Sequence, residues 1–238
     1  MVRVAALLLA IIGAGACGES SVLNVAAASS LRVALAEAAE AGGAPTSTRI
    51  GFGGSQTGAA QVEGGARIDV VVMAGAQPLD RLVAKGLVEE PVTIGWGTLA
   101  IIVADGNPHD VRSLADLVRL SESGFVMLPA PDVPAGAAAA RALHAAGLSL
   151  EPVALQRSAA GVATQVATGA ADAGIAYLSD GNVEGVDAVE IDRAPAVPYR
   201  AAVVRDSSHP EKARRWLAAL SHPDARAILS AAGIEPEA

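Results

Sequence analysis

Residues 22–43 read VLNVAAASSLRVALAEAAEAGG, and this stretch carries the pattern that recurs along the chain. The short apolar run 22–26 predicts a buried strand. The run from Ser30 to Ala41 consists of good helix formers, and it begins with a hydroxyl side chain suited to an N-cap. Gly42 and Gly43 then end the predicted helix. A strand followed directly by a helix indicates an α/β fold with mostly parallel strands.

The same alternation continues toward the C-terminus. Further apolar strands are predicted at 49–52, 69–74, 98–104, 125–128, 173–178 and 200–205. Helical patterns follow or separate them at 56–63, 79–85, 113–120, 135–146, 161–168, 210–219 and 223–232. Glycine and proline stand at many of the boundaries between these elements, as expected of turns and helix ends. The whole chain after residue 22 therefore fits one α/β architecture.

The first seventeen residues have the character of an export signal. After one arginine, the apolar run 4–12 is too short to span a membrane, which takes about 20 apolar residues. Small residues follow and lead to Cys17, the only cysteine of the chain. This arrangement resembles a bacterial lipoprotein signal, and an ordinary secretory signal with an incidental cysteine is the alternative. We expect a signal peptide at 1–16, a tether at 17–21 and an extracytoplasmic protein anchored by a lipid on Cys17.

Charge and composition exclude several functional classes. The formal charge of −8 and the absence of a basic run argue against nucleic acid or an anionic lipid surface as a partner. Contact with a membrane is then expected through the lipid anchor only. Aromatic residues make up 3% of the chain, too few for a stacking platform. One cysteine and four scattered histidines predict no zinc site, no disulfide and no cofactor.

The motifs of common enzymes are missing as well. Ser55 lies in Gly-Gly-Ser-Gln-Thr-Gly, which is not the Gly-x-Ser-x-Gly elbow of a hydrolase. The chain has neither a Gly-x-x-x-x-Gly-Lys-Ser/Thr phosphate loop nor a Gly-x-Gly-x-x-Gly motif that begins a helix. We therefore expect a protein that is not an enzyme, with an exported hydrolase as the alternative.

Four junctions between a loop and a predicted helix carry serine or glycine, at 28–30, 54–56, 134–136 and 158–161. The first amides of a helix lack intrahelical acceptors, and the helix dipole adds partial positive charge there, so such junctions bind anions. A single junction of this kind is common in any α/β protein. Four of them in an exported protein without a catalytic motif favour the capture of a small oxyanion.

Five sequence motifs together resemble the molybdate-binding proteins of ABC-type molybdate transporters. They follow one another in the order of that family: VAAASSL at 25–31, FGGSQT at 52–57, EGGARIDVVVMA at 63–74, VPAG at 133–136 and GIAYLSD at 174–180. The resemblance extends from about Val22 to Gly233, nearly the whole mature chain.

This resemblance implies a type II periplasmic-binding-protein fold. In such a fold, two α/β lobes with mixed, mainly parallel sheets enclose a ligand cleft, and two crossovers join the lobes. Transferred to this sequence, lobe 1 would consist of 22–97 and 198–238, and lobe 2 of 98–197.

The resemblance also implies a set of ligand contacts. In that family, serine hydroxyls, backbone amides and a tyrosine hydroxyl hold the tetrahedral dianion through its oxygens. The matching positions here are Ser29, Ser55, Ala135, Ala159 and Tyr177. Ala159 matches only through its spacing before Tyr177, and the motif at Ser55 has Gly-Gly-Ser-Gln where the family often has several serines.

The implied function is the capture of molybdate and its delivery, by a monomer, to the permease of an ABC importer. Tungstate is too similar to molybdate to be separated from it, and sulfate or phosphate are alternatives. Protonated phosphate needs an acceptor, and none of the five contacts is a carboxylate. We also expect no arginine clamp at Arg32, Arg157 or Arg200, the arginines nearest in sequence to these contacts or to the crossover.

Overall fold

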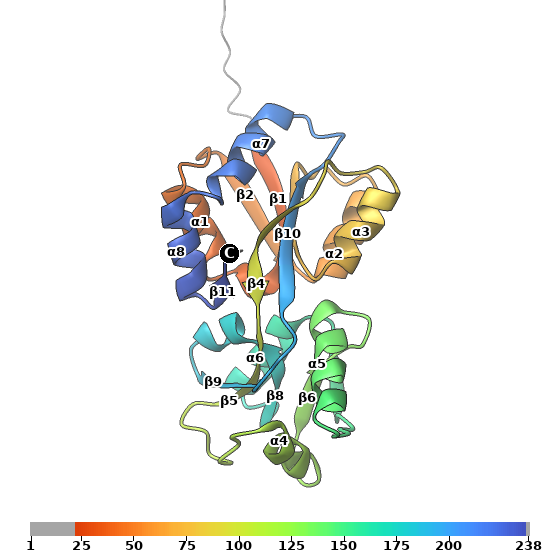
Figure 1. Cartoon of the computed structure of the whole chain (residues 1–238), viewed down its shortest axis with the longest axis vertical. Helices are drawn as coiled ribbons and strands as arrows, with labels where there is room; N and C mark the ends of the chain where they lie inside the picture. The colour runs from red at the N-terminus through yellow and green to blue at the C-terminus, as the bar shows by residue number, and fades with distance from the viewer. Residues whose placement is uncertain (1–21, 237–238) are drawn as a thin grey trace, which may run out of the picture.

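The computed structural model describes residues 22–236, which form two halves that each contain one sheet (Figure 1). In spatial order, the six-stranded sheet consists of β11 (Ile234–Glu235), β4 (Val92–Gly97), β10 (Val197–Val203), β3 (Val70–Ala74), β1 (Leu23–Ala28) and β2 (Thr48–Gly53). The five-stranded sheet consists of β7 (Ala154–Gln156), β6 (Val126–Pro129), β8 (Ala173–Tyr177), β5 (Leu99–Ala104) and β9 (Val186–Glu190). The predicted signal peptide, tether and Cys17 lie outside the described residues.

Helices cover both faces of the six-stranded sheet (Figure 1). One face packs against α1 (Leu35–Ala41), α7 (Pro210–Ala219) and α8 (Pro223–Ala231), and the other against α2 (Ser55–Glu63) and α3 (Gln77–Ala84). The central strand β3 is buried on both faces, which explains its continuous apolar sequence VVVMA. We call this part the six-stranded half.

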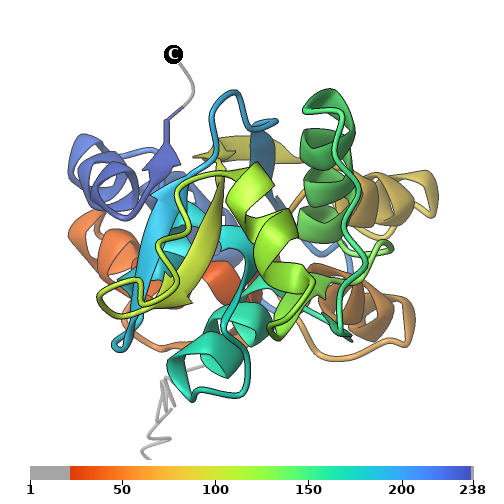
Figure 2. The same cartoon turned by 90° about the horizontal axis from the view of Figure 1, so that it is seen from below.

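The second part, the five-stranded half, contains α4 (Leu114–Ser121), α5 (Pro134–Ala145) and α6 (Ala159–Ala167) around its sheet (Figure 2). Two short 3₁₀ helices, η1 (Ser29–Leu31) and η2 (Leu178–Asn182), directly follow β1 and β8. The chain passes from one half to the other between β4 and β5 and returns between β9 and β10 (Figure 1).

Both sheets are mixed, as expected, and most strands of each sheet run in one direction, namely β1, β2, β3 and β4 in the six-stranded sheet and β6, β7, β8 and β9 in the five-stranded sheet. The parallel pairs are β1 with β2 and β3, and β6 with β7 and β8. All strands that carry the chain between the halves, namely β4, β5, β9 and β10, form antiparallel pairs only. The sequence analysis missed β4 and β9, and with them much of this antiparallel part.

The helix predicted from Ser30 to Ala41 is interrupted, which corrects the expected N-cap. A 3₁₀ turn at Ser29–Leu31 comes first, and α1 begins only at Leu35. Ser30 is buried, and its Oγ accepts a hydrogen bond of 2.8 Å from the Tyr199 hydroxyl instead of capping a helix. A fully buried tyrosine hydroxyl needs such a partner, and this need determines the role of Ser30.

Other helix boundaries follow the expected capping chemistry. The predicted cap Ser113 accepts a hydrogen bond from the Asp116 amide at the start of α4. Helix α6 begins at Ala159 rather than at Gly161, because Ser158 acts as its N-cap.

Within residues 22–236, no helix is long and apolar enough to cross a membrane. The same residues hold no group of three or more His, Cys, Asp or Glu side chains arranged to bind a metal ion.

Candidate functional site

A small cavity lies where the two halves meet, and all five residues implied by the resemblance line it. The volume of this cavity is about 20 Å³. The six-stranded half contributes Ala28, Ser29, Ser30, Gly53, Gly54, Ser55 and Ala74, and the five-stranded half contributes Val133, Pro134, Ala135, Arg157, Ser158, Ala159 and Tyr177. The fold thus brings together side chains that are far apart in the sequence, such as Ser29 and Tyr177, which are 148 residues apart.

Helix starts supply backbone donors from both sides of the cavity. On one side, η1 begins at Ser29 and α2 begins at Ser55. On the other side, Ala135 lies in the first turn of α5 and Ala159 is the first residue of α6. The amides of a first turn have no intrahelical acceptor, so they are available to a ligand. At α6, the Ser158 hydroxyl satisfies only the Gly161 amide, at 3.1 Å.

The Ser55 hydroxyl is oriented by a bond inside the six-stranded half. Ser55 is buried, and its Oγ accepts a hydrogen bond of 3.0 Å from the Ala74 amide. Because the hydroxyl uses its oxygen for this bond, its own proton remains free to be donated. Ser29 is half-buried, and within residues 22–236 its hydroxyl makes no hydrogen bond. Both serines are therefore available as donors.

The Tyr177 hydroxyl is a buried donor without a partner among the described residues. The side chain is 3% exposed, and its ring lies 5.6 Å from the ring of Tyr199. Burial raises the pKa of Tyr177 well above its ordinary value, so the hydroxyl keeps its proton. An unpaired buried hydroxyl is costly, and an oxygen acceptor in the cavity would satisfy it.

Behind this tyrosine lies a buried carboxyl that the sequence analysis did not single out. The Asp180 side chain is 3% exposed, and its Oδ2 accepts a hydrogen bond of 3.1 Å from the Tyr177 amide. Burial raises the pKa of Asp180 to about 7. Its position three residues after Tyr177, within GIAYLSD, was the only available signal.

Neutral groups dominate the lining of the cavity. Among the described residues that line it, Arg157 alone has a charged side chain, and that side chain is exposed. The other two arginines considered from the sequence have different partners. The Arg32 guanidinium lies 4.8 Å from the centre of the Phe52 ring, and Arg200 forms an ion pair with Asp80. Apart from Arg157, the side chains that line the cavity are therefore neutral.

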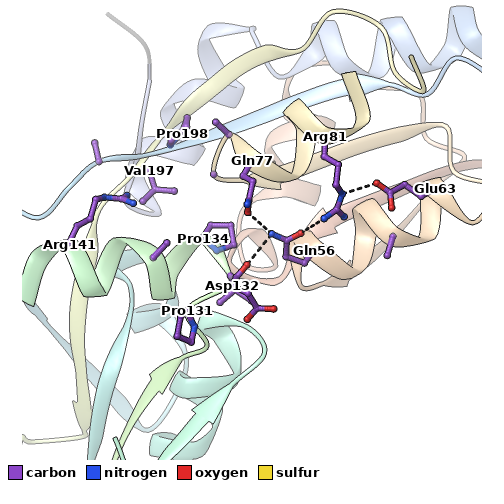
Figure 3. Close-up of a pocket in the computed structure, with 16 residues that line it drawn as sticks. Gln56, Glu63, Gln77, Arg81, Pro131, Asp132, Pro134, Arg141, Val197 and Pro198 are labelled. Atoms are coloured by element: carbon purple, nitrogen blue, oxygen red, sulfur yellow. Dashed lines mark hydrogen bonds and ion pairs between the residues drawn. The ribbon is translucent and has the colours of Figure 1, made fainter. Parts of the chain in front are cut away.

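The two halves approach closely around the cavity. A methyl group added to Gly54 would lie 3.1 Å from the carbonyl oxygen of Arg157 in the other half. Gly75, with a φ of +76°, would place such a methyl group 2.7 Å from Pro134. A larger cavity of about 880 Å³ lies on the outer side of Pro134, between α2, α3 and α5 (Figure 3). The halves are thus in contact beside the cavity.

Comparison with known proteins gives the same result as the motifs. The family model described as bacterial extracellular solute-binding protein matches residues 23–235. The molybdate-binding protein ModA of Mycobacterium tuberculosis is 34% identical over 223 residues, which cover 91% of this chain and 85% of that protein. An aconitate isomerase of a Pseudomonas species is 31% identical over 178 residues, which cover 71% of this chain and 67% of that protein.

Comparison of folds agrees with this assignment. The solved structure of the periplasmic molybdate-binding protein of Azotobacter vinelandii has a TM-score of 0.78 to this chain. The two chains are 20% identical, and the alignment covers 91% of this chain and 100% of the other. The type II periplasmic-binding-protein fold and the likeness to molybdate-binding proteins, both predicted from the motifs, are confirmed. The chain belongs to the bacterial extracellular solute-binding proteins.

Proposed function

We propose that this protein captures molybdate outside the cytoplasm and delivers it to the permease of an ABC importer. The observation that carries the proposal is the convergence of helix starts and buried hydroxyls from both halves on one small cavity. The 34% identity to a molybdate-binding protein supports molybdate as the ligand. Tungstate has the same charge and shape, and we include it as a second ligand of the same site.

In this proposal the anion is bound entirely by neutral donors. A fully ionised tetrahedral dianion offers only acceptors, and hydroxyls and first-turn amides offer protons to it. Ser29 and Ser55 would bind it from lobe 1, and Ala135, Ala159 and Tyr177 from lobe 2. Lobe 1 would be 22–97 with 198–238, and lobe 2 would be 98–197. Because the ligand touches both lobes, its binding favours the closed state.

We further propose that the protein is not an enzyme, although an isomerase is among its relatives. General acid–base catalysis needs a titratable group within reach of the substrate. Among the described residues that line the cavity, none is His, Lys, Asp, Glu or Cys. Tyr177 retains its proton because burial raises its pKa, so it is a poor base. The cavity therefore favours binding over proton transfer.

A monomer without a cofactor is sufficient, because the cavity is completed by the two halves of one chain. Lipid attachment at Cys17 would keep the protein beside its permease after export. A lipid anchor holds a soluble domain at the membrane without inserting it.

Isothermal titration of the purified protein is expected to give 1:1 binding of molybdate or tungstate. Sulfate should bind much more weakly, because a smaller ion cannot reach all donors at good hydrogen-bond length. The titrations should also include phosphate, as another tetrahedral anion, and aconitate, as the compound named in the isomerase relative. A ligand at 100 times its Kd should also stabilise the protein by about 2.7 kcal/mol. Equal affinity for sulfate would contradict the molybdate assignment. Preferential binding of aconitate would favour an isomerase activity over molybdate capture.

Substitution of Arg157 tests whether neutral donors suffice. Arg157→Gln is expected to weaken molybdate binding by less than about tenfold, or about 1.4 kcal/mol, because the exposed guanidinium interacts through solvent. Arg32→Gln is a matched control, since Arg32 contacts Phe52 instead of the cavity. The measurement is the Kd by titration calorimetry. A thousandfold loss in Arg157→Gln alone would reveal a direct ion pair with the anion.

A further inference from the structure

The side chain of Gln56 connects the two halves beside the small cavity (Figure 3). Gln56 follows Ser55 in the first turn of α2. Its Nε2 donates a hydrogen bond of 2.9 Å to Gln77 Oε1 in the same half. The same nitrogen donates one of 3.0 Å to the carbonyl oxygen of Asp132, in the loop before α5 of the other half.

A second set of contacts fixes the orientation of the Gln56 amide. Arg81 Nη1 donates to Gln56 Oε1 at 2.9 Å, and Arg81 Nε forms an ion pair with Glu63 Oε1 at 2.7 Å. A guanidinium has donors only, so it must face the amide oxygen. The amide nitrogen is then directed toward Gln77 and Asp132. Contacts within the six-stranded half thus orient the donor that faces Asp132.

This contact is the best-formed side-chain hydrogen bond between the halves. In the described part of the chain, one other such bond joins them, from Asn182 Nδ2 to the Ala232 carbonyl oxygen at 3.5 Å. That length is at the limit of a hydrogen bond, whereas 3.0 Å is near the optimum. The Gln56 contact is also solvent-accessible, since it borders the cavity of about 880 Å³. Water can therefore replace it when the halves separate, so the contact is reversible.

We propose that Gln56 is a closure latch, which holds the lobes together through Asp132 and slows the release of the bound anion. The proposal rests on the proposed function, because release of molybdate is the step that the latch controls. Gln56 does not line the small cavity, so it acts on the lobes and not on the ligand. A latch present only in the closed state affects the dissociation rate and leaves the association rate unchanged.

The test compares Gln56→Met with Gln61→Met. Methionine keeps the length of the side chain and removes its donors. Gln61 is an exposed residue of the same helix with no side-chain hydrogen bond among the described residues, so it is a matched control. Stopped-flow tryptophan fluorescence would give both rate constants for molybdate, titration calorimetry the Kd, and thermal unfolding the stability without ligand.

Of the hydrogen bonds that Gln56→Met removes, only the one to Asp132 joins the halves, and its loss predicts about three- to tenfold faster dissociation. The association rate, the unfolding temperature without ligand and all values of Gln61→Met should match those of the wild type. An unchanged dissociation rate in Gln56→Met would overturn the latch while leaving the ligand assignment intact. Equal effects of both variants, or a matching loss of stability, would also overturn it. If the wild type does not bind molybdate at all, the proposed function fails first and the latch fails with it.

Discussion

Replacement of Ser55 by alanine is expected to weaken molybdate binding by about 10- to 150-fold. The substitution removes one hydrogen bond to a charged group, and such a bond contributes about 1.5–3 kcal/mol. The buried hydroxyl accepts from the Ala74 amide and has its proton left for the ligand. Alanine removes both bonds, and it leaves the Ala74 amide without its side-chain acceptor. We therefore expect lower stability of the unliganded protein as well.

Thr57→Ala is the matched control for Ser55→Ala. Thr57 lies two residues further along α2, and its side chain is exposed, so the substitution removes a hydroxyl from the same helix without touching the small cavity. Calorimetric titration with molybdate and thermal unfolding without ligand would separate the two effects. If Ser55→Ala loses stability but binds molybdate as tightly as Thr57→Ala, the hydroxyl has a structural role only.

The site residues could be predicted from sequence motifs because the feature that matters at several of them is a helix start, which neighbouring residues determine. Ala135 and Ala159 contribute backbone amides, and a first-turn amide is free wherever the helix begins there. Ser55 belongs to the same class, since it begins α2 after Gly54. Such features are encoded by a few adjacent residues, so a sequence motif predicts them. Their binding of the anion remains a prediction.

Contacts between distant segments were not predictable in this way. The hydroxyls of Tyr199 and Ser30 pair across 169 residues, and Gln56 reaches the Asp132 carbonyl across 76 residues. A local pattern holds no information on such pairs. Ser30 shows the consequence, because its preference for a helix N-cap was overridden by a buried partner from β10.

The missed strands have a different cause. The sequence of β4, VTIGWG, contains two glycines, and that of β9, VDAVE, contains two carboxylates. Both compositions are unfavourable for strands in general. Here the glycines permit close packing, since a methyl group on Gly97 would lie 2.6 Å from the Tyr199 ring and one on Gly95 would lie 2.7 Å from Ile234. In β4, packing within the six-stranded half thus outweighs the local preference.

The pH dependence of stability is expected to change strongly in Asp180→Asn. The folded protein raises the pKa of Asp180 from 3.8 to about 7, chiefly because the carboxyl is buried. Between these values the folded chain retains a proton that the unfolded chain releases, so the wild type loses stability as the pH rises from about 4 to about 7. This difference in pKa corresponds to about 4 kcal/mol. Asparagine keeps an oxygen acceptor for the Tyr177 amide and cannot ionise.

Urea unfolding at pH 4 and pH 8 would measure this effect, with Asp192→Asn as the control. The Asp192 side chain is 94% exposed, and its replacement removes the same charge from the same half of the molecule. We expect the stability of Asp180→Asn relative to the wild type to increase by several kcal/mol between pH 4 and pH 8, whereas that of Asp192→Asn should hardly change. Because Asp180 accepts a hydrogen bond from the amide of Tyr177, the result also reports on the cavity. Parallel pH profiles of stability for Asp180→Asn and the wild type would mean that water reaches the carboxylate. The Tyr177 hydroxyl would then lie in a more hydrated site than its burial implies.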